Sequence, residues 1–215
     1  MADSRYIVIE GPIGVGKTSL ARRLADVMEG EPVLEEAGAN PFLERFYQDP
    51  RGAALPAQLF FMFQRVRQLE QLAQADMFTD LRVSDFLLAK DRLFAQITLD
   101  RDELSLYEQI FDKLDFNPPA PDLVVYLQAP VDTLLFRIAQ RGIRYEQDIK
   151  RRYLERLTDA YSQFFHQYNE SPLLIVNAAT IDPVNNEEHF QMLLHEIDTT
   201  RSGRQFFNPL ISALA

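Results

Sequence analysis

The sequence predicts an α/β fold in which a parallel sheet of five strands is flanked by helices. Short apolar segments alternate with longer segments of helical spacing along the chain. The apolar segments are continuous hydrophobic runs, which is typical of parallel strands buried on both faces. A glycine-rich turn joins the first apolar segment to the first helical one. We therefore expect the 215 residues to form one domain, 1–215.

The five strands follow the apolar runs in chain order. They are expected at residues 6–9, 32–34, 81–85, 123–127 and 173–176. Before the fourth strand, the sequence Asn-Pro-Pro-Ala-Pro at 117–121 predicts a stiff connector. The chain after residue 199 shows neither strand nor helix spacing and is expected to be irregular.

The helices are predicted from apolar residues that recur on one face. They are expected at residues 18–28, 41–47, 54–74, 89–99, 103–114, 131–141, 149–168 and 187–197. Asn40 and Pro41 fit the N-cap and the first position of the second helix. Gly30 and Gly142 follow helical segments and are expected to end them.

Composition restricts the kind of protein. A net charge of −10 and a pI of about 4.8 disfavour a nucleic-acid binder, which usually carries a basic face. The chain has no cysteine and no apolar run near the roughly 20 residues of a membrane helix. No apolar signal region precedes the first strand, so we expect a cytoplasmic protein without a membrane partner.

Residues 11–18 read Gly-Pro-Ile-Gly-Val-Gly-Lys-Thr, which satisfies the phosphate-binding pattern G-x-x-x-x-G-K-[ST]. The glycines allow a tight turn whose amides point at phosphate oxygens, and the following helix adds its positive N-terminal end. Lys17 is expected to reach the β- and γ-phosphates, and Thr18 to bind Mg²⁺. The expected ATP-binding residues of this P-loop are Gly11, Pro12, Ile13, Gly14, Val15, Gly16, Lys17, Thr18 and Ser19.

The P-loop leaves the reaction open. The chain lacks the N-K-x-D motif of GTPases and the L-S-G-G-Q motif of ABC ATPases. Five arginines between residues 137 and 152 interrupt an otherwise acidic chain, either as a solvated helix face or as a local basic site. A small P-loop chain of this kind looks more like a nucleoside or nucleotide kinase.

Polar residues in apolar surroundings suggest an acceptor site. Gln58 and Arg65 lie on one face of an otherwise apolar helix, and Asp91 could pair with Arg65. Together these groups suit a nucleobase edge, or else an internal structural network. Glu35 and Asp85 follow strands two and three, where α/β sheets bind ligands. Glu35 could accept a proton from a hydroxyl, and Asp85 could hold magnesium.

At these positions the sequence resembles the deoxynucleoside kinases. The residues that carry the resemblance are Glu35, the segment Asn-Pro-Phe-Leu-Glu-Arg-Phe-Tyr-Gln-Asp-Pro at 40–50, Gln58 with Arg65, and Asp85 with Asp91. The likeness runs over about residues 5–170 and is greatest to the bacterial deoxyadenosine/deoxyguanosine kinase branch. It implies a P-loop kinase fold with an arginine-bearing lid at about 137–150, and a homodimer.

The resemblance implies ATP- and Mg²⁺-dependent phosphorylation of a deoxynucleoside 5′-hydroxyl. It favours purine over pyrimidine substrates. Glu35 would be the catalytic base, with Glu36 as the alternative, and Lys17 and Arg141 would also be catalytic residues. Base recognition would fall to Gln58, Arg65 and Asp91, sugar recognition to Tyr47 and Glu146, and phosphate binding to Lys17, Arg137, Arg141 and Arg144. Phe61, Phe86 and Phe94 are either pocket walls or ordinary core.

One departure from the family pattern concerns the residue after Asp85. The family usually has Asp/Glu-Arg-Ser there, and its arginine lies near the reacting hydroxyl, whereas this chain has Asp85-Phe86-Leu87. Either another arginine substitutes, or substrate choice or rate has changed. The alternatives to a deoxynucleoside kinase are a nucleoside monophosphate kinase, such as a thymidylate kinase, and a catalytically weak nucleotide-binding regulatory protein.

Overall fold

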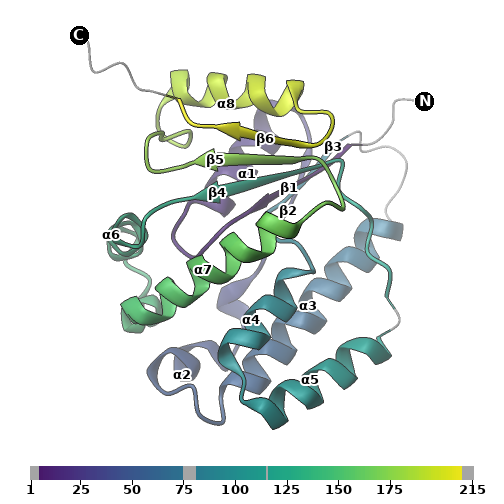
Figure 1. The fold of residues 1–215 in the computed structure, drawn as a ribbon, viewed down its shortest axis with the longest axis vertical. Coiled ribbons are helices and arrows are strands. Elements are labelled where there is room, and N and C mark those ends of the chain that lie inside the picture. The colour runs from purple at the N-terminus through teal and green to yellow at the C-terminus, as the bar shows by residue number, and fades with distance from the viewer. Residues whose placement is uncertain (1–4, 75–80, 115, 210–215) are drawn as a thin grey trace.

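The computed structural model describes residues 5–74, 81–114 and 116–209 and contains one sheet of six strands in the order β2-β3-β1-β4-β5-β6 (Figure 1). Every neighbouring pair of strands is parallel. The strands are β1 (Arg5–Glu10), β2 (Glu31–Val33), β3 (Leu81–Ser84), β4 (Leu123–Gln128), β5 (Leu173–Asn177) and β6 (Arg204–Phe207). The α/β class with a parallel sheet is as predicted.

The prediction of five strands was wrong, because β6 pairs with β5 at the edge of the sheet. This strand is short and only its last residue, Phe207, is buried, while Phe206 is 72% exposed. It therefore lacks the continuous apolar run that marks the inner strands. A tertiary contact also holds it, since Arg204 donates to the carbonyl oxygens of Phe165 and Tyr168.

The helices lie close to their predicted positions. They are α1 (Lys17–Val27), α2 (Leu43–Gln48), α3 (Ala54–Gln74), α4 (Lys90–Thr98), α5 (Arg101–Lys113), α6 (Val131–Arg141), α7 (Arg151–Gln167) and α8 (Glu187–Thr199). Short 3-10 helices cover Ala37–Ala39 and Arg144–Asp148. Among these helices, none has the length and hydropathy needed to cross a bilayer.

The helix predicted to begin at Pro41 begins at Leu43 instead. Asn40 is buried, its side-chain oxygen accepts from the Phe42 amide at 3.0 Å, and its amide donates to the Ala57 carbonyl at 3.1 Å. The side chain thus forms a local turn and joins it to α3, which delays the helix by two residues.

Helices cover both faces of the sheet. In the view of Figure 1, α7 lies in front of the strands and α1 behind them, where α1 contacts β1, β2 and β3. Helices α3, α4 and α5 pack on one another below the sheet, and α4 also packs on α7. The inner strands β1 and β4 form the centre of the core, with Ile7, Val8, Val124 and Val125 fully buried. Each such side chain contributes about 1.5–3 kcal/mol.

Strand pairing brings three chain segments to one edge of the sheet. Ser84 of β3 pairs with Val8 of β1 and with Val33 of β2, so the carboxyl ends of the three strands lie side by side. The P-loop, Glu35 and Asp85 each follow one of these ends. A parallel sheet therefore assembles residues that are far apart in sequence into one site.

Candidate active site

The P-loop forms the turn between β1 and α1. Gly11 has φ 148°, and a Cβ there would lie 2.5 Å from the Leu127 carbonyl oxygen. Gly14 has φ 84°, and a Cβ there would lie 2.8 Å from a side-chain carbon of Ile138. Both positions require glycine because the loop packs directly against β4 and α6.

Lys17 begins α1 and folds over the loop. Its ammonium group donates to the carbonyl oxygens of Gly11 at 2.7 Å and Pro12 at 3.3 Å. Burial lowers the pKa of Lys17 to about 8, with a further contribution from the positive charge of Lys90. The lysine is thus positioned among the loop atoms that would surround a phosphate chain.

The structure brings Thr18 and Asp85 together at the edge of the P-loop. The Thr18 hydroxyl donates to one oxygen of Asp85 at 2.5 Å, and the Glu35 amide donates to the other at 2.7 Å. Among the described residues, no group of three or more acidic, histidine or cysteine side chains could hold a metal by itself. A hydroxyl and one carboxylate instead suit Mg²⁺, which keeps several waters and takes its other ligands from substrate phosphates.

Glu35 and Glu36 have different surroundings. The Glu35 carboxylate lies in a cavity with Lys17 and forms an ion pair with Arg65. Burial raises the pKa of Glu35, whereas Arg65 and Lys90 lower it more, to about 2. Glu36 is exposed, and its backbone oxygen accepts from Gln64. Of the two glutamates, only Glu35 faces the P-loop lysine across this cavity.

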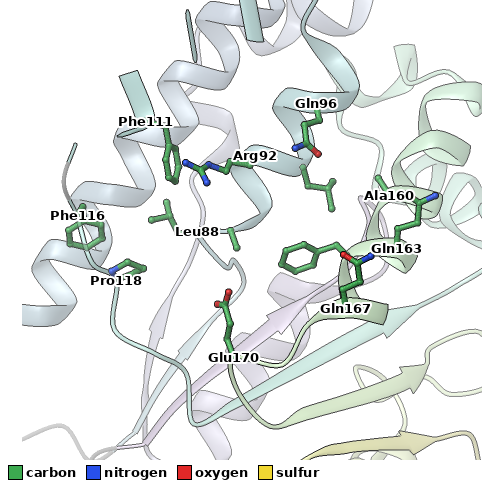
Figure 2. A pocket seen from close by; sticks show the side chains of 13 residues that line it. Leu88, Arg92, Gln96, Phe111, Phe116, Pro118, Ala160, Gln163, Gln167 and Glu170 are labelled. Atoms are coloured by element: carbon green, nitrogen blue, oxygen red, sulfur yellow. The ribbon is translucent and has the colours of Figure 1, made fainter. Parts of the chain in front are cut away.

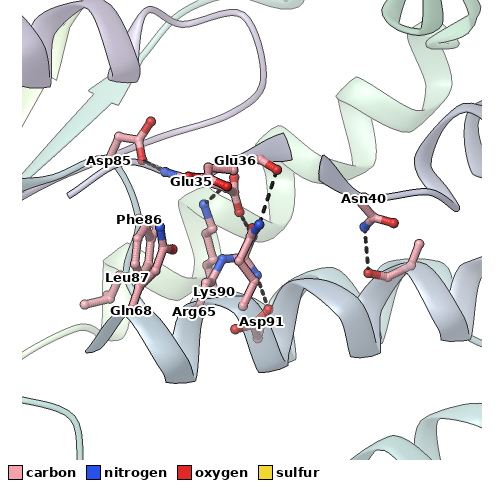
Figure 3. A network of polar contacts seen from close by, with 12 residues as sticks. Glu35, Glu36, Asn40, Arg65, Gln68, Asp85, Phe86, Leu87, Lys90 and Asp91 are labelled. Atoms are coloured by element: carbon pink, nitrogen blue, oxygen red, sulfur yellow. Dashed lines mark hydrogen bonds and ion pairs between the residues drawn. The ribbon is translucent and has the colours of Figure 1, made fainter. Parts of the chain in front are cut away.

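Arg65 joins two carboxylates in a buried network, which Figure 3 shows. It forms ion pairs with Glu35 and with Asp91, so the pairing expected from the sequence is present. Gln58 and Arg65 line the cavity, but Asp91 is fully buried behind Arg65 and does not. Burial raises the pKa of Asp91 to about 6, and the positive charge of Arg65 offsets this only in part.

The cavity has a volume of about 110 Å³. Its walls include Phe61 and Phe94, whereas Phe86 is buried in the core and does not line it. Tyr47 and Glu146, the residues expected at the sugar, also border it. A second hollow of about 650 Å³ continues from the cavity and shares several residues with it. These shared residues are Thr18, Glu35, Ala37, Arg141 and Glu146.

The three expected lid arginines have different environments. Arg137 donates to the carbonyl oxygens of Val15 at 3.1 Å and Ala178 at 2.8 Å. Arg141 borders the cavity and forms an ion pair with Glu146. Arg144 is 94% exposed and its nearest carboxylate is 3.9 Å away on Glu44, so it is not brought to the P-loop.

A hollow of about 380 Å³ lies on the outer side of the P-loop. It is bordered by the loop itself, by Ser19 and Arg137, and by the chain after β5, including Asp182 and Val184. Arg23 of α1 donates to the Val184 carbonyl and so fixes this chain segment. The hollow shares Gly14 and Arg141 with the cavity, which makes it a suitable place for the rest of a nucleotide.

A further hollow of about 570 Å³ lies away from the P-loop, between α4, α5 and α7 (Figure 2). Its lining combines apolar and polar side chains. It includes Leu88, Arg92, Phe111, Pro118, Gln163 and Glu170. None of the residues expected in the site borders it, so its size alone does not make it the functional site.

Two charged residues of the site were not identified from the sequence. Lys90 is 3% exposed and lies 3.4 Å from Glu35 and 3.6 Å from Glu10. Glu10 is fully buried and accepts from the Gly11 amide and the Tyr161 hydroxyl. In the sequence, each of these charged residues ends an apolar segment: Glu10 ends residues 6–10 and Lys90 ends residues 86–90. A charged residue at such a position is hard to distinguish from one that is solvated at the end of a strand or helix.

The chain is similar to several known proteins. Residues 7–201 match the family described as "Deoxynucleoside kinase". The deoxyguanosine kinase of Bacillus subtilis is 33% identical over 199 residues, covering 90% of this chain and 96% of that protein. The deoxyadenosine kinase of Lactobacillus acidophilus is 30% identical over 208 residues, covering 90% and 95%. A deoxyadenosine kinase structure from M. mycoides has a TM-score of 0.79 at 23% identity, covering 90% of this chain and 99% of that one.

Proposed function

The chain belongs to the deoxynucleoside kinase family, and on this premise we propose that it transfers the γ-phosphoryl group of ATP to the 5′-hydroxyl of a purine deoxynucleoside. Membership makes it a transferase that phosphorylates nucleosides. The purine preference rests on relatives named as deoxyguanosine and deoxyadenosine kinases. One relative at 28% identity is named deoxyadenosine/deoxycytidine kinase, so the preference needs its own test.

The observation that carries the proposal is the position of Glu35. Its carboxylate shares a cavity with Lys17 and Thr18 of the P-loop. A pKa near 2 keeps this carboxylate ionised at neutral pH, so it can accept a proton from a hydroxyl group. A weak base is sufficient because the transferring phosphoryl group passes through a loose transition state, in which positioning dominates.

In the proposed reaction, the 5′-oxygen forms a bond to the γ-phosphorus as the bond to the ADP oxygen breaks. Glu35 takes the hydroxyl proton and later releases it to solvent. Lys17 and Arg141 bind the phosphate oxygens, and Arg137 holds the P-loop against the chain after β5. These roles place the donor in the outer hollow and the acceptor in the cavity, with Arg141 at the border of both.

Mg²⁺ would be held by the Thr18 hydroxyl and, through water, by Asp85. The ion would supply positive charge that offsets the charge developing on the phosphate groups. Asp85 also accepts from the Glu35 amide, so the same carboxylate positions the backbone of the proposed base.

The acceptor base would meet Gln58 and Arg65. Gln58 offers both a donor and an acceptor, and it is 3% exposed on the cavity wall. Arg65 lies over the Phe61 ring at 5.0 Å, so the wall combines a flat aromatic surface with polar groups. We assign Asp91 the role of fixing Arg65, and Tyr47 and Glu146 contacts to the sugar.

A panel of the natural nucleosides and their monophosphates, supplied with ATP and Mg²⁺, tests the proposal by the product nucleotide formed. We expect deoxyadenosine and deoxyguanosine to be phosphorylated most efficiently. Phosphorylation of monophosphates alone would contradict the proposed acceptor, and preference for a pyrimidine would contradict the base assignment only.

We also propose a homodimer that forms through α3 and α5. Phe63 and Leu106 are 46% and 47% exposed on these two adjacent helices. Such apolar side chains suit burial against a second copy.

The double variant F63E/L106E should be a monomer by light scattering. The control variant F136E alters a residue on α6 that is 62% exposed, and it should keep the wild-type mass. A monomeric wild-type protein would contradict this proposal.

A further inference from the structure

Lys90 is a buried lysine at an electrostatically unfavourable position. It is the first residue of α4, where the positive end of the helix dipole disfavours a cation. Its side chain is 4% exposed, so the ammonium group has lost most of its hydration. Nearby carboxylates must compensate for both effects, and the structure shows which of them bind the lysine.

Two carboxylates lie near the Lys90 ammonium. Glu35 Oε2 is 3.4 Å away and forms a hydrogen bond, while Glu10 Oε1 is 3.6 Å away. Glu10 already accepts from the amides of Gly11 and Leu87, each at 2.8 Å, and from the Tyr161 hydroxyl at 2.9 Å. Of these two carboxylates, Glu35 accepts a hydrogen bond from Lys90, whereas Glu10 pairs with it by charge at a slightly longer distance.

The two oxygens of Glu35 are thus bound by cations from two helices. Arg65 of α3 binds Oε1, and Lys90 of α4 binds Oε2 (Figure 3). A carboxylate held at both oxygens has a fixed plane and a fixed direction. This geometry would aim the remaining lone pairs of Glu35 into the cavity that Lys90 itself also lines.

We propose that Lys90 is a positioning residue for phosphoryl transfer, which together with Arg65 orients the Glu35 carboxylate toward the acceptor hydroxyl. The inference rests on the proposed function, because it assumes that Glu35 is the base. In this role Lys90 would supply a cation beside the proposed base, which Phe86, at the position where the family usually has arginine, cannot supply.

The surroundings of Phe86 agree with this role. Phe86 is fully buried in the core and does not line the cavity, so its side chain does not reach the reacting groups. Its ring centroid lies 5.9 Å from the Lys90 ammonium. The Phe86 ring therefore lies beside the ammonium group, near the outer limit of a cation–π contact.

A double-mutant cycle between Lys90 and Glu35 tests the proposal. The variants are K90M, E35Q and the double variant, and kcat and KM are measured for both substrates. K90M should lower kcat about 30- to 100-fold in the presence of Glu35, with KM values within about threefold of wild type. In the E35Q background the same substitution should change kcat less than about threefold, because its target is gone. R92M, on the exposed side of α4, is the matched control and should keep wild-type kcat.

Chemical rescue separates the charge from the packing of the side chain. The wild-type chain has no cysteine, so K90C contains a single thiol. Alkylation of unfolded K90C with 2-bromoethylamine, followed by refolding, creates a lysine analogue, whereas 1-bromopropane creates a neutral one of similar shape. Wild-type protein taken through the same treatment reports the refolding yield. We expect the amine to restore kcat and the propyl group to leave it low.

The outcomes separate this inference from the proposed function. Wild-type protein that phosphorylates no nucleoside would contradict the proposed function itself. An active wild type in which the K90M and E35Q losses multiply would overturn the role of Lys90 and leave the proposed function standing. Equal rescue by the amine and the propyl group would also overturn it, since packing alone would then explain the effect. If K90M does not fold, the alkylated K90C proteins decide the question.

Discussion

The Arg141 guanidinium binds both carboxylate oxygens of Glu146, with Nη2–Oε1 at 2.6 Å and Nε–Oε2 at 3.0 Å. Arg141 also borders the outer hollow, the cavity and the larger hollow that continues from it. The ion pair therefore lies where the proposed donor and acceptor sites meet. A bidentate pair fixes the direction of the guanidinium better than a single contact does.

Replacing Arg141 with glutamine should lower kcat about 10²-fold, because the transferring phosphoryl group loses a cation. The nucleoside KM should change less, since Glu146 remains. Steady-state kinetics with the preferred nucleoside measures both quantities. Arg152 is an exposed arginine on α7, so R152Q makes the same charge change away from the site and should keep its kcat. Similar losses in the two variants would argue for a general charge effect instead.

Glu35→Gln should lower kcat about 10²- to 10⁴-fold, because the proton acceptor is lost together with the charge that pairs with Arg65 and Lys90. ATP affinity should stay close to wild type, because Glu35 is not part of the P-loop. Isothermal titration with ATP and a product assay give the two values. Glu36→Gln is the matched control, since Glu36 carries the same charge one residue away and is exposed. A larger loss in E36Q than in E35Q would transfer the proposed role to Glu36.

Much of the fold is predictable because the inner strands are continuous apolar runs and the P-loop has fixed spacing. The edge strand β6 could not be predicted in this way, because it begins with Arg204 and Gln205 and is held only by tertiary contacts. The first residue of α2 was also predicted incorrectly, because the buried Asn40 side chain competes with the helix for backbone groups.

Some residues of the candidate site could also be predicted from the sequence, and others could not. Glu35, Gln58, Arg65 and Asp85 could be selected as polar residues at strand ends or in apolar helices. Lys90 could not be selected in this way, because a lysine at the start of a helix is usually solvated. Only the fold shows that it lies between two carboxylates. The exposure of Arg144 could not be predicted either, because it depends on the 3-10 helix Arg144–Asp148, which lies between the predicted helices at 131–141 and 149–168 and was not itself predicted.

Asp85→Asn should raise the Mg²⁺ concentration for half-maximal activity about tenfold. The asparagine oxygen can still accept from the Glu35 amide, but its amide group cannot accept from Thr18. High Mg²⁺ should therefore restore much of kcat. Asp132→Asn alters an exposed aspartate that pairs with Arg151, so its Mg²⁺ dependence should match wild type. An unchanged Mg²⁺ requirement in D85N would contradict the metal assignment.

Asp91 should make the free energy of unfolding depend on pH between about 4 and 6. Its carboxyl ionises near 3.8 in the unfolded chain, and burial raises the pKa to about 6 in the folded protein. The folded state therefore binds this proton more tightly, and the resulting stabilisation is complete below pH 4 and is lost as the pH rises through 6. The loss should be roughly 2–3 kcal/mol.

Asp91→Asn isolates this effect because asparagine does not titrate. Urea unfolding at several pH values gives the difference in unfolding free energy between wild type and D91N. That difference should fall by roughly 2–3 kcal/mol from pH 4 to pH 7, and stay level above it. A difference that does not fall between pH 4 and pH 7 would mean that Arg65 holds the Asp91 carboxylate ionised throughout this range. The shared guanidinium would then stabilise Asp91 as strongly as it stabilises Glu35.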